Sequence, residues 1–204
     1  MAASNRVNGL KVTALTGSSI AEVIPALARL RIAVFREYPY LYEGSLEYEA
    51  AYLGTYVRCP QSVIVVVDNG GQIVGASSGL PLSAETENLR EPFTAAGWDV
   101  ECVFYLAESV LLPAYRGRGL GHAFFDHRET HARALGGFTH TAFCAVQRDE
   151  YERPGDAPRS LEGFWRARGY APEPELTATM HWQEVGQAQE TEHQMQFWTR
   201  ALER

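Results

Sequence analysis

The chain has 204 residues, of which 46% are hydrophobic and 21% charged, which is ordinary for one globular domain. Its formal net charge of −7 argues against nucleic acid as the main partner, because proteins that bind phosphate backbones usually present a basic face. The N-terminus has no charged and apolar leader, and no apolar stretch has the length of a membrane span. We therefore expect a cytoplasmic protein without a membrane partner.

The first part of the chain predicts two helices joined by an aromatic loop. A short strand is expected over residues 10–15, and apolar positions at helical spacing then predict a helix up to Val34. Ser19 and Glu22 have the spacing of a capping box at the start of that helix. A second helix is expected over residues 46–58. The loop between the two helices carries three tyrosines and a carboxylate, which are Tyr38, Tyr40, Tyr42 and Glu43.

A β-hairpin and a polar insertion follow. Residues 62–67 are dense in β-branched side chains, and the Asp-Asn-Gly-Gly run at 68–71 is a strong hairpin turn signal. The partner strand is expected over residues 72–80. Residues 81–100 are polar and contain Glu85, Glu87 and Glu91, so we expect a long insertion with a helical turn, which is either functional or a plain surface excursion.

The second half of the chain predicts a strand–helix–strand unit and a closing pair of strands. The expected elements are a strand over 101–112, a helix over 123–135, a strand over 139–146, a short helix over 160–168 and strands over 177–182 and 194–199. The predicted order is β-α-α-β-β-β-α-β-α-β-β, a mixed α/β sheet with helices on both faces. We expect one domain over residues 1–204, with its core at about 10–183 and a C-terminal closing strand at about 194–199.

A glycine-rich turn separates the strand over 101–112 from the helix that follows it. Gly117, Gly119 and Gly121 stand at alternate positions, so the backbone can curl and an anion can approach it closely. The unpaired N–H groups of a helix that begins there would point at the anion. The turn is not a P-loop or a dinucleotide-binding fingerprint, because His122 occupies the place where those motifs need lysine or a small residue. It predicts a phosphate cradle of another kind.

The run from Arg116 to Gly121 fits the pattern Arg/Gln-x-x-Gly-x-Gly/Ala. With the strand before it, this run resembles the acyl-CoA signature of the GCN5-related N-acetyltransferase (GNAT) superfamily. Residues 163–170 are similar to the aromatic-rich penultimate helix of that family. The resemblance implies acetyl-CoA or another short acyl-CoA as co-substrate and no metal. It also implies direct attack of a primary amine on the thioester in a ternary complex.

The resemblance also implies which residues bind the cofactor. Backbone N–H groups of the turn would hold the pyrophosphate, and the pantetheine arm would pair with the strand before it. The residues implied are Val110, Leu111, Leu112, Arg116, Gly117, Arg118, Gly119, Leu120 and Gly121. The two arginines either add charge near the phosphates or face solvent. The N–H of Leu111 would stabilise the oxyanion that forms on the thioester carbonyl.

Glu108 is the candidate general base, since an acidic residue inside an apolar strand needs a reason. The alternative is an edge carboxylate paired with a surface arginine. The family often protonates the leaving thiolate with a tyrosine of the late helix, but Phe164 and Trp165 occupy that region here and tryptophan cannot act as the acid. We expect Tyr170 to pack in the core. Tyr151 is a weak substitute, so the general acid stays open.

The acceptor site implied by the resemblance is the loop with Tyr38, Tyr40, Tyr42 and Glu43. Its rings and carboxylate could hold a cationic amine, or the rings could instead pack on the core. We expect a small-molecule amine as acceptor. The alternatives are a protein or peptide amine and a non-catalytic acyl-CoA sensor. The acidic insertion would suit a basic peptide or a polyamine equally well. Whether the chain forms a homodimer stays open.

Two further signals carry less weight. His127 and His131 lie one helical turn apart, but no glutamate follows the first histidine directly and no third ligand is evident. We interpret them as part of a solvated helix face. Three cysteines, Cys59, Cys102 and Cys144, cannot all pair with one another, which fits a reducing compartment.

Overall fold

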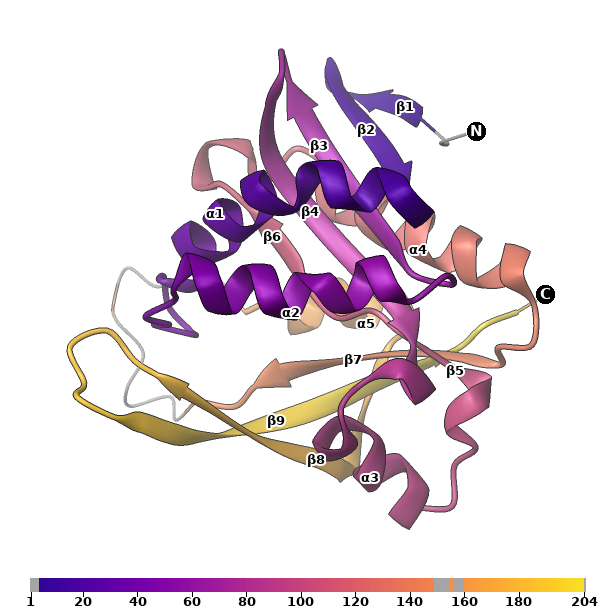
Figure 1. The fold of residues 1–204 in the computed structure, drawn as a ribbon. Helices are drawn as coiled ribbons and strands as arrows, with labels where there is room; N and C mark the ends of the chain where they lie inside the picture. Colours follow the sequence, from indigo (N-terminus) through magenta and orange to yellow (C-terminus); the bar gives the residue numbers. More distant parts are fainter. Residues whose placement is uncertain (1–3, 149–154, 156–159, 204) are drawn as a thin grey trace.

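A computed structural model describes residues 4–148, 155 and 160–203, and its strands form one mixed sheet (Figure 1). The nine strands of these described residues are β1 Ser4–Val7, β2 Leu10–Leu15, β3 Val63–Asn69, β4 Gln72–Pro81, β5 Val103–Tyr105, β6 Ser109–Leu111, β7 His140–Val146, β8 Ala171–Gln183 and β9 Glu190–Ala201. The α-helices are α1 Ile24–Phe35, α2 Leu46–Arg58, α3 Glu87–Ala95, α4 Leu120–Leu135 and α5 Glu162–Ala167. Short 3₁₀ helices are η1 Gly17–Val23, η2 Leu82–Ala84, η3 Val100–Cys102 and η4 Pro113–Tyr115.

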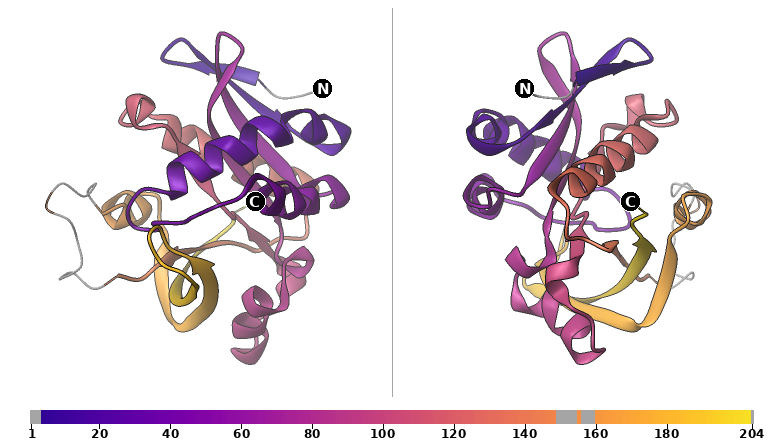
Figure 2. Two further views of the ribbon diagram at one scale, coloured as in Figure 1. Left: turned by 60° about the vertical axis from the view of Figure 1, so that its left-hand side comes forward. Right: turned by 90° about the vertical axis from the view of Figure 1, so that its right-hand side faces the viewer.

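The sheet has the order β1-β2-β3-β4-β5-β7-β9-β8, and β6 pairs with β4 further along that strand. Neighbouring strands are antiparallel, except that β5 and β7 are parallel. Helices α1 and α2 lie across one face, and α4 and α5 lie on the other (Figures 1 and 2). The predicted mixed α/β fold with helices on both faces is therefore confirmed.

Strand β3 shows why the sheet is covered on both faces. Ile64 and Val66 pack with the side chains of α1 and α2, whereas Val63, Val65 and Val67 pack with those of α4. All five side chains are buried. Successive side chains of a strand point to opposite faces, so a continuous apolar run of this kind needs a layer of helices on each side.

The strand predicted over residues 101–112 is broken, and in this respect the prediction was wrong. The N–H of Ala107 donates to the carbonyl of Ser78 at 3.1 Å, and the N–H of Ser78 donates to the carbonyl of Glu108 at 3.1 Å. Two residues thus oppose one, which is a β-bulge. On one side of the bulge β5 pairs with both β4 and β7, and on the other side β6 pairs with β4 alone. The sheet opens between β6 and β7.

Three other boundaries differ from the sequence predictions. Ser19 lies inside η1 and its hydroxyl donates to the carbonyl of Thr16 at 2.8 Å, so the predicted capping box is wrong. The polar insertion contains the nine-residue helix α3, more than the helical turn expected. The closing pair of strands is longer than predicted, and β9 lies between β7 and β8 in the sheet.

Arg128 of α4 holds the bulge from the side opposite α1 and α2. Its guanidinium donates to the carbonyls of Ser78 and Glu108 at 3.1 and 3.0 Å and to the hydroxyl of Ser109 at 2.9 Å. The side chain is 1% exposed, and no carboxylate among the described residues pairs with it. Burial lowers the pKa of Arg128 to about 10, so the group stays charged at neutral pH. One buried cation therefore fixes the backbone on both strands of the bulge.

We predict that Arg128→Met lowers the free energy of unfolding by about 3 kcal/mol, because it leaves buried carbonyl and hydroxyl oxygens without a donor. Urea unfolding followed by circular dichroism measures this change. Arg29→Met, at an exposed position of α1, is the matched control and should shift the value by less than about 0.5 kcal/mol. Equal unfolding free energies for the two variants would contradict the assigned role of Arg128.

Candidate active site

The glycine-rich turn leads directly into α4. Gly117 and Gly119 have φ values of 72° and 76°, in the left-handed region that favours glycine, and Gly119 is the N-cap of α4. Among the residues that the structure describes, no carbonyl accepts a hydrogen bond from the N–H groups of residues 117–121. Unpaired donors at a helix N-terminus suit an anionic group. Phosphate binding at this turn stays a prediction.

Gly121 has a different role from the other two glycines. A Cβ atom at this position would lie 3.3 Å from Cζ of Phe164, tighter than an ordinary contact. The ring of Phe164 also meets the edge of His122, with 4.9 Å between ring centroids. The absence of a side chain at Gly121 therefore lets α5 pack closely against the start of α4.

The two arginines of the turn are held differently. Arg116 pairs with Glu37 at 2.8 Å and donates through Nε to the carbonyl of Leu111 at 3.0 Å, so its side chain is already engaged. Arg118 lies over the ring of Tyr115, 5.3 Å from the centroid. No carboxylate of the described residues pairs with Arg118. Arg118 is therefore the cation of this turn that is available to an anion.

The backbone of β6 has a free side. The N–H of Leu112 donates to the carbonyl of Val74 at 3.0 Å, and the carbonyl of Glu108 accepts from Ser78. Alternate residues of an antiparallel ladder face the same neighbour, so Ser109 and Leu111 direct their N–H groups away from β4. These two N–H groups face the side on which β7 pairs with β5 but no longer pairs with β6. This is the orientation that the prediction for Leu111 requires.

Glu108 lies in a buried cluster of charges below α1 and α2. Its Oε2 is 2.9 Å from Nη1 of Arg31, whose Nε pairs with Glu49. The hydroxyls of Tyr52 and Tyr56 donate to the same Oε2 at 3.4 and 3.3 Å. Glu108 is 8% exposed. The interpretation of Glu108 as an edge carboxylate paired with a surface arginine is therefore wrong, because the arginine is buried.

The cluster contains two carboxyl groups and one guanidinium group. Burial alone would lower the pKa of Arg31, but Glu108, Tyr52 and Glu49 outweigh it and raise this pKa above its usual value. The guanidinium of Arg31 thus pairs with the carboxyl groups of both Glu108 and Glu49. The second oxygen of Glu108, Oε1, is buried and has no hydrogen-bond partner among the described residues. That oxygen therefore has an acceptor position that no described group of the protein fills.

Sequence reasoning missed the partners of Glu108, although their spacing gives a signal. Glu49, Tyr52 and Tyr56 recur three and four residues apart, so they lie on one face of α2. Arg31 interrupts the apolar face of α1, beside Leu30. An arginine on the apolar face of α1 and a glutamate on one face of α2 suggest an ion pair between the two helices. Only the fold shows that these two faces meet at Glu108.

Glu85 is another buried carboxyl group, and it was not among the residues predicted for the site. It follows η2, is 7% exposed, and lines a groove of about 540 Å³ between α2 and η2. The other residues of the groove are Tyr52, Thr55, Arg58, Cys59, Pro60, Ala84 and Thr86. Burial raises the pKa of Glu85 to about 7. The groove therefore contains a carboxyl group that titrates near neutral pH.

The aromatic loop is only partly available to an acceptor. Tyr40 packs between Phe35 and Trp182, with ring centroids 4.8 and 5.8 Å away, so core packing is the correct interpretation for this ring. Glu43 is exposed and pairs with Arg36 at 2.6 Å. The remaining two predicted residues, Tyr38 and Tyr42, are half-buried.

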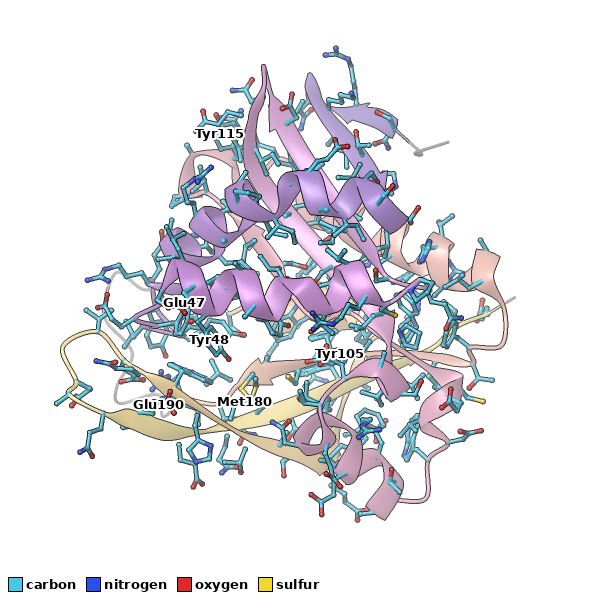
Figure 3. The ribbon with its side chains drawn as sticks, viewed as in Figure 1. Glu47, Tyr48, Tyr105, Tyr115, Met180 and Glu190 are labelled. Carbon is cyan, nitrogen blue, oxygen red and sulfur yellow. The ribbon has the colours of Figure 1, made fainter. Side chains whose placement is uncertain are left out.

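This loop is joined to the β8–β9 hairpin. The N–H of Glu43 donates to the carbonyl of Gln183 at 2.8 Å, and that of Val185 donates to the carbonyl of Leu41 at 2.7 Å. In Figure 3, Tyr48, Tyr105 and Met180 extend into the space between α2 and strands β7 to β9. The loop and the hairpin are therefore joined by backbone hydrogen bonds on the side of the sheet that α1 and α2 cover.

The general acid stays open. Trp165 packs against Phe143 and Trp198, with ring centroids 5.0 and 5.2 Å away. Tyr170 is buried and its hydroxyl contacts Thr141 at 2.8 Å, which confirms that it packs in the core. Tyr151 lies outside the described residues.

Within residues 4–148, 155 and 160–203, no group of three or more His, Cys, Asp or Glu is placed to hold a metal ion. His127 contacts Asn5 at 3.2 Å, and His131 contacts the carbonyl of Gln61 at 2.9 Å, so the two rings have separate partners. No helix in the described part of the chain has the length and apolarity to cross a membrane.

Comparisons with known proteins agree with this geometry. The model of the acetyltransferase (GNAT) family matches residues 27–153, which is more than half of the chain. No curated protein sequence matches the chain.

Solved structures share the fold at low identity. Ribosomal-protein-alanine N-acetyltransferase from Brucella melitensis is 16% identical with a TM-score of 0.59, covering 92% of this chain and 98% of its own. YncA from Salmonella typhimurium, solved with its cofactor acetyl-CoA, is 12% identical with a TM-score of 0.59, covering 95% of each chain. Arabidopsis thaliana NAA60, in complex with a bisubstrate analogue, is 11% identical with a TM-score of 0.57, covering 93% of this chain and 97% of its own. The chain belongs to the GNAT acetyltransferase family.

Proposed function

We propose that this protein transfers the acetyl group of acetyl-CoA to a primary amine of a small molecule, by direct attack in a ternary complex. One observation carries the proposal. A single bulged segment supplies both the buried carboxylate oxygen Oε1 of Glu108 and the outward-facing N–H of Leu111. Acyl transfer to an amine needs a proton acceptor and an oxyanion donor at one place.

Acetyl-CoA as donor is supported by the turn and by the complex of YncA with that cofactor. The N–H groups of residues 117–121 and the charge of Arg118 would bind the pyrophosphate. The open side of β6, at Ser109 and Leu111, would pair with the amides of the pantetheine arm. The thioester would then lie beside the bulge.

The reaction follows from these positions. A lysine-like amine has a pKa of about 10.4, so only roughly 1 molecule in 2,000 is neutral at pH 7. Glu108 would take the proton of the amine as its nitrogen attacks the thioester carbonyl carbon. The C–N bond forms, the C–S bond breaks, and the thiolate of CoA leaves. The N–H of Leu111 would stabilise the oxyanion between these events.

A panel of small amines and short peptides, assayed by the release of free thiol from acetyl-CoA, tests the activity. Turnover with a small amine supports the proposal, whereas turnover with the peptides alone would favour a peptide acceptor. The second candidate is a non-catalytic acyl-CoA sensor, which the packed Trp165 in the late helix favours. Such a sensor would bind acetyl-CoA and release no thiol with any acceptor in the panel.

We predict that Gly119→Glu weakens acetyl-CoA binding by at least about 100-fold, because a carboxylate then stands against the pyrophosphate. Isothermal titration calorimetry measures this affinity. Gly97→Glu is the matched control, because Gly97 has a similar φ of 80° and also has open space at its Cβ. An unchanged affinity in Gly119→Glu would exclude the turn as the phosphate site.

We predict that Glu108→Gln lowers kcat by about 100-fold or more and changes the affinity for acetyl-CoA by less than about threefold. The amide keeps the size of the side chain but cannot accept the proton. Steady-state kinetics and calorimetry measure the two quantities. Glu22→Gln, at an exposed position, is the control for the same chemical change. A wild-type kcat in Glu108→Gln would rule out this residue as the base.

A further inference from the structure

Glu85 is a buried carboxyl group that the mechanism above does not use. Within the part of the chain that the structure describes, its side chain makes one hydrogen bond, in which Oε2 accepts from the N–H of Thr86 at 3.3 Å. Among the described residues, no lysine or arginine pairs with it. Burying a carboxylate without a cation is costly. A ligand that supplies the cation would remove this cost.

The position of Glu85 connects the groove with the candidate base. Tyr52 lines the groove beside Glu85, and the hydroxyl of the same tyrosine donates to Glu108 at 3.4 Å. The charges of Glu85 and Glu108 also repel one another, so the two carboxyls lie in one electrostatic environment. An acceptor in the groove would contact Glu85 and Tyr52, and the hydroxyl of Tyr52 connects the groove with Glu108.

Neither of the two arginines near Glu85 forms an ion pair with it. Arg31 already serves Glu108 and Glu49. Arg58 lines the groove, where its guanidinium donates to the uncharged hydroxyl of Thr55 at 3.2 Å and lies toward Gly54, without a carboxylate partner among the described residues. The other groups that face Glu85 carry no positive charge, and they are Tyr52, Tyr56, Tyr105, Cys144 and Glu108. Arg58 is thus the one cation in the described lining of the groove, and it makes no ion pair with Glu85.

We infer that Glu85 binds a second positively charged group of the acceptor, so that diamines and polyamines are preferred over monoamines. This inference rests on the proposed function. The reacting amine would meet Glu108, and the second ammonium group would bind Glu85 in the groove. Glu85 is then a specificity residue and takes no proton from the attacking nitrogen.

Matched pairs of acceptors test this inference. Butylamine and diaminobutane have the same carbon chain, as do hexylamine and diaminohexane, so each pair differs by one ammonium group. We expect the diamine to have the higher kcat/KM in the wild-type protein, by about 10- to 100-fold. Glu85→Gln should remove this preference while kcat/KM for the monoamines and KM for acetyl-CoA stay within about twofold.

The matched control is Glu87→Gln, an exposed position two residues further along. It should keep the preference for diamines. Equal use of monoamines and diamines by the wild-type protein would overturn the inference. So would an equal loss of activity with both acceptors in Glu85→Gln, because that result is expected of a residue that accepts the proton.

Equilibrium binding separates this inference from the proposed function. Calorimetry with diaminobutane needs no turnover, and Glu85→Gln should lose most of the binding. Since the pKa of Glu85 is about 7 in the free protein and the diamine stays charged, affinity should rise about tenfold from pH 6 to pH 8. This rise should be absent in Glu85→Gln. Diamine binding without thiol release would refute the proposed function alone, whereas binding that is unaffected by Glu85→Gln would refute the inference.

Discussion

At Ala107 and Glu108 two residues of one strand oppose the single Ser78 of β4, and this bulge determines the direction of the residues after it. It places the side chain of Glu108 on the face that α1 and α2 cover, and it parts β6 from β7. A regular ladder would have continued the pairing of β5 with β7 and used the outer N–H of Leu111 for the sheet. The candidate site exists because that pairing stops.

Two arginines hold this arrangement from opposite faces. Arg128 binds the carbonyls of Ser78 and Glu108 from the α4 side, and Arg31 binds the carboxylate of Glu108 from the α1 side. Buried charges of this kind stabilise a fold only weakly, since their desolvation opposes their attraction. We therefore interpret the two arginines as residues that fix the position of the strand break, because both guanidinium groups bind to the same bulge.

The predicted elements that are correct depend on local signals. The hairpin of β3 and β4 follows from its β-branched run and its Asn69-Gly70 turn, and α2 spans the predicted residues. Ser45 caps α2 through the N–H of Tyr48 at 3.2 Å. Such features are decided by residues a few positions apart, so the sequence alone predicts them well.

The features that were missed depend on distant residues. Nothing within residues 101–112 indicates a bulge, because the groups that hold it come from Ser78 and Arg128. Glu49 and Arg31 are distinctive only once the two helices are adjacent. The glycine turn could be predicted as a cradle from its own residues, whereas the acceptor side could not. Tyr40 in the predicted loop packs in the core, and Glu85 in the polar insertion lines the groove.

We propose that the break between β5 and β6 builds the binding site for acetyl-CoA. Amide hydrogen exchange with and without acetyl-CoA tests it at the residues concerned. We expect slower exchange in the bound protein for residues 109 and 111 and for residues 117–121, because their free N–H groups acquire acceptors. Protection of the turn without residues 109 and 111, or binding that leaves both segments unchanged, would show that the strand break is not the binding site.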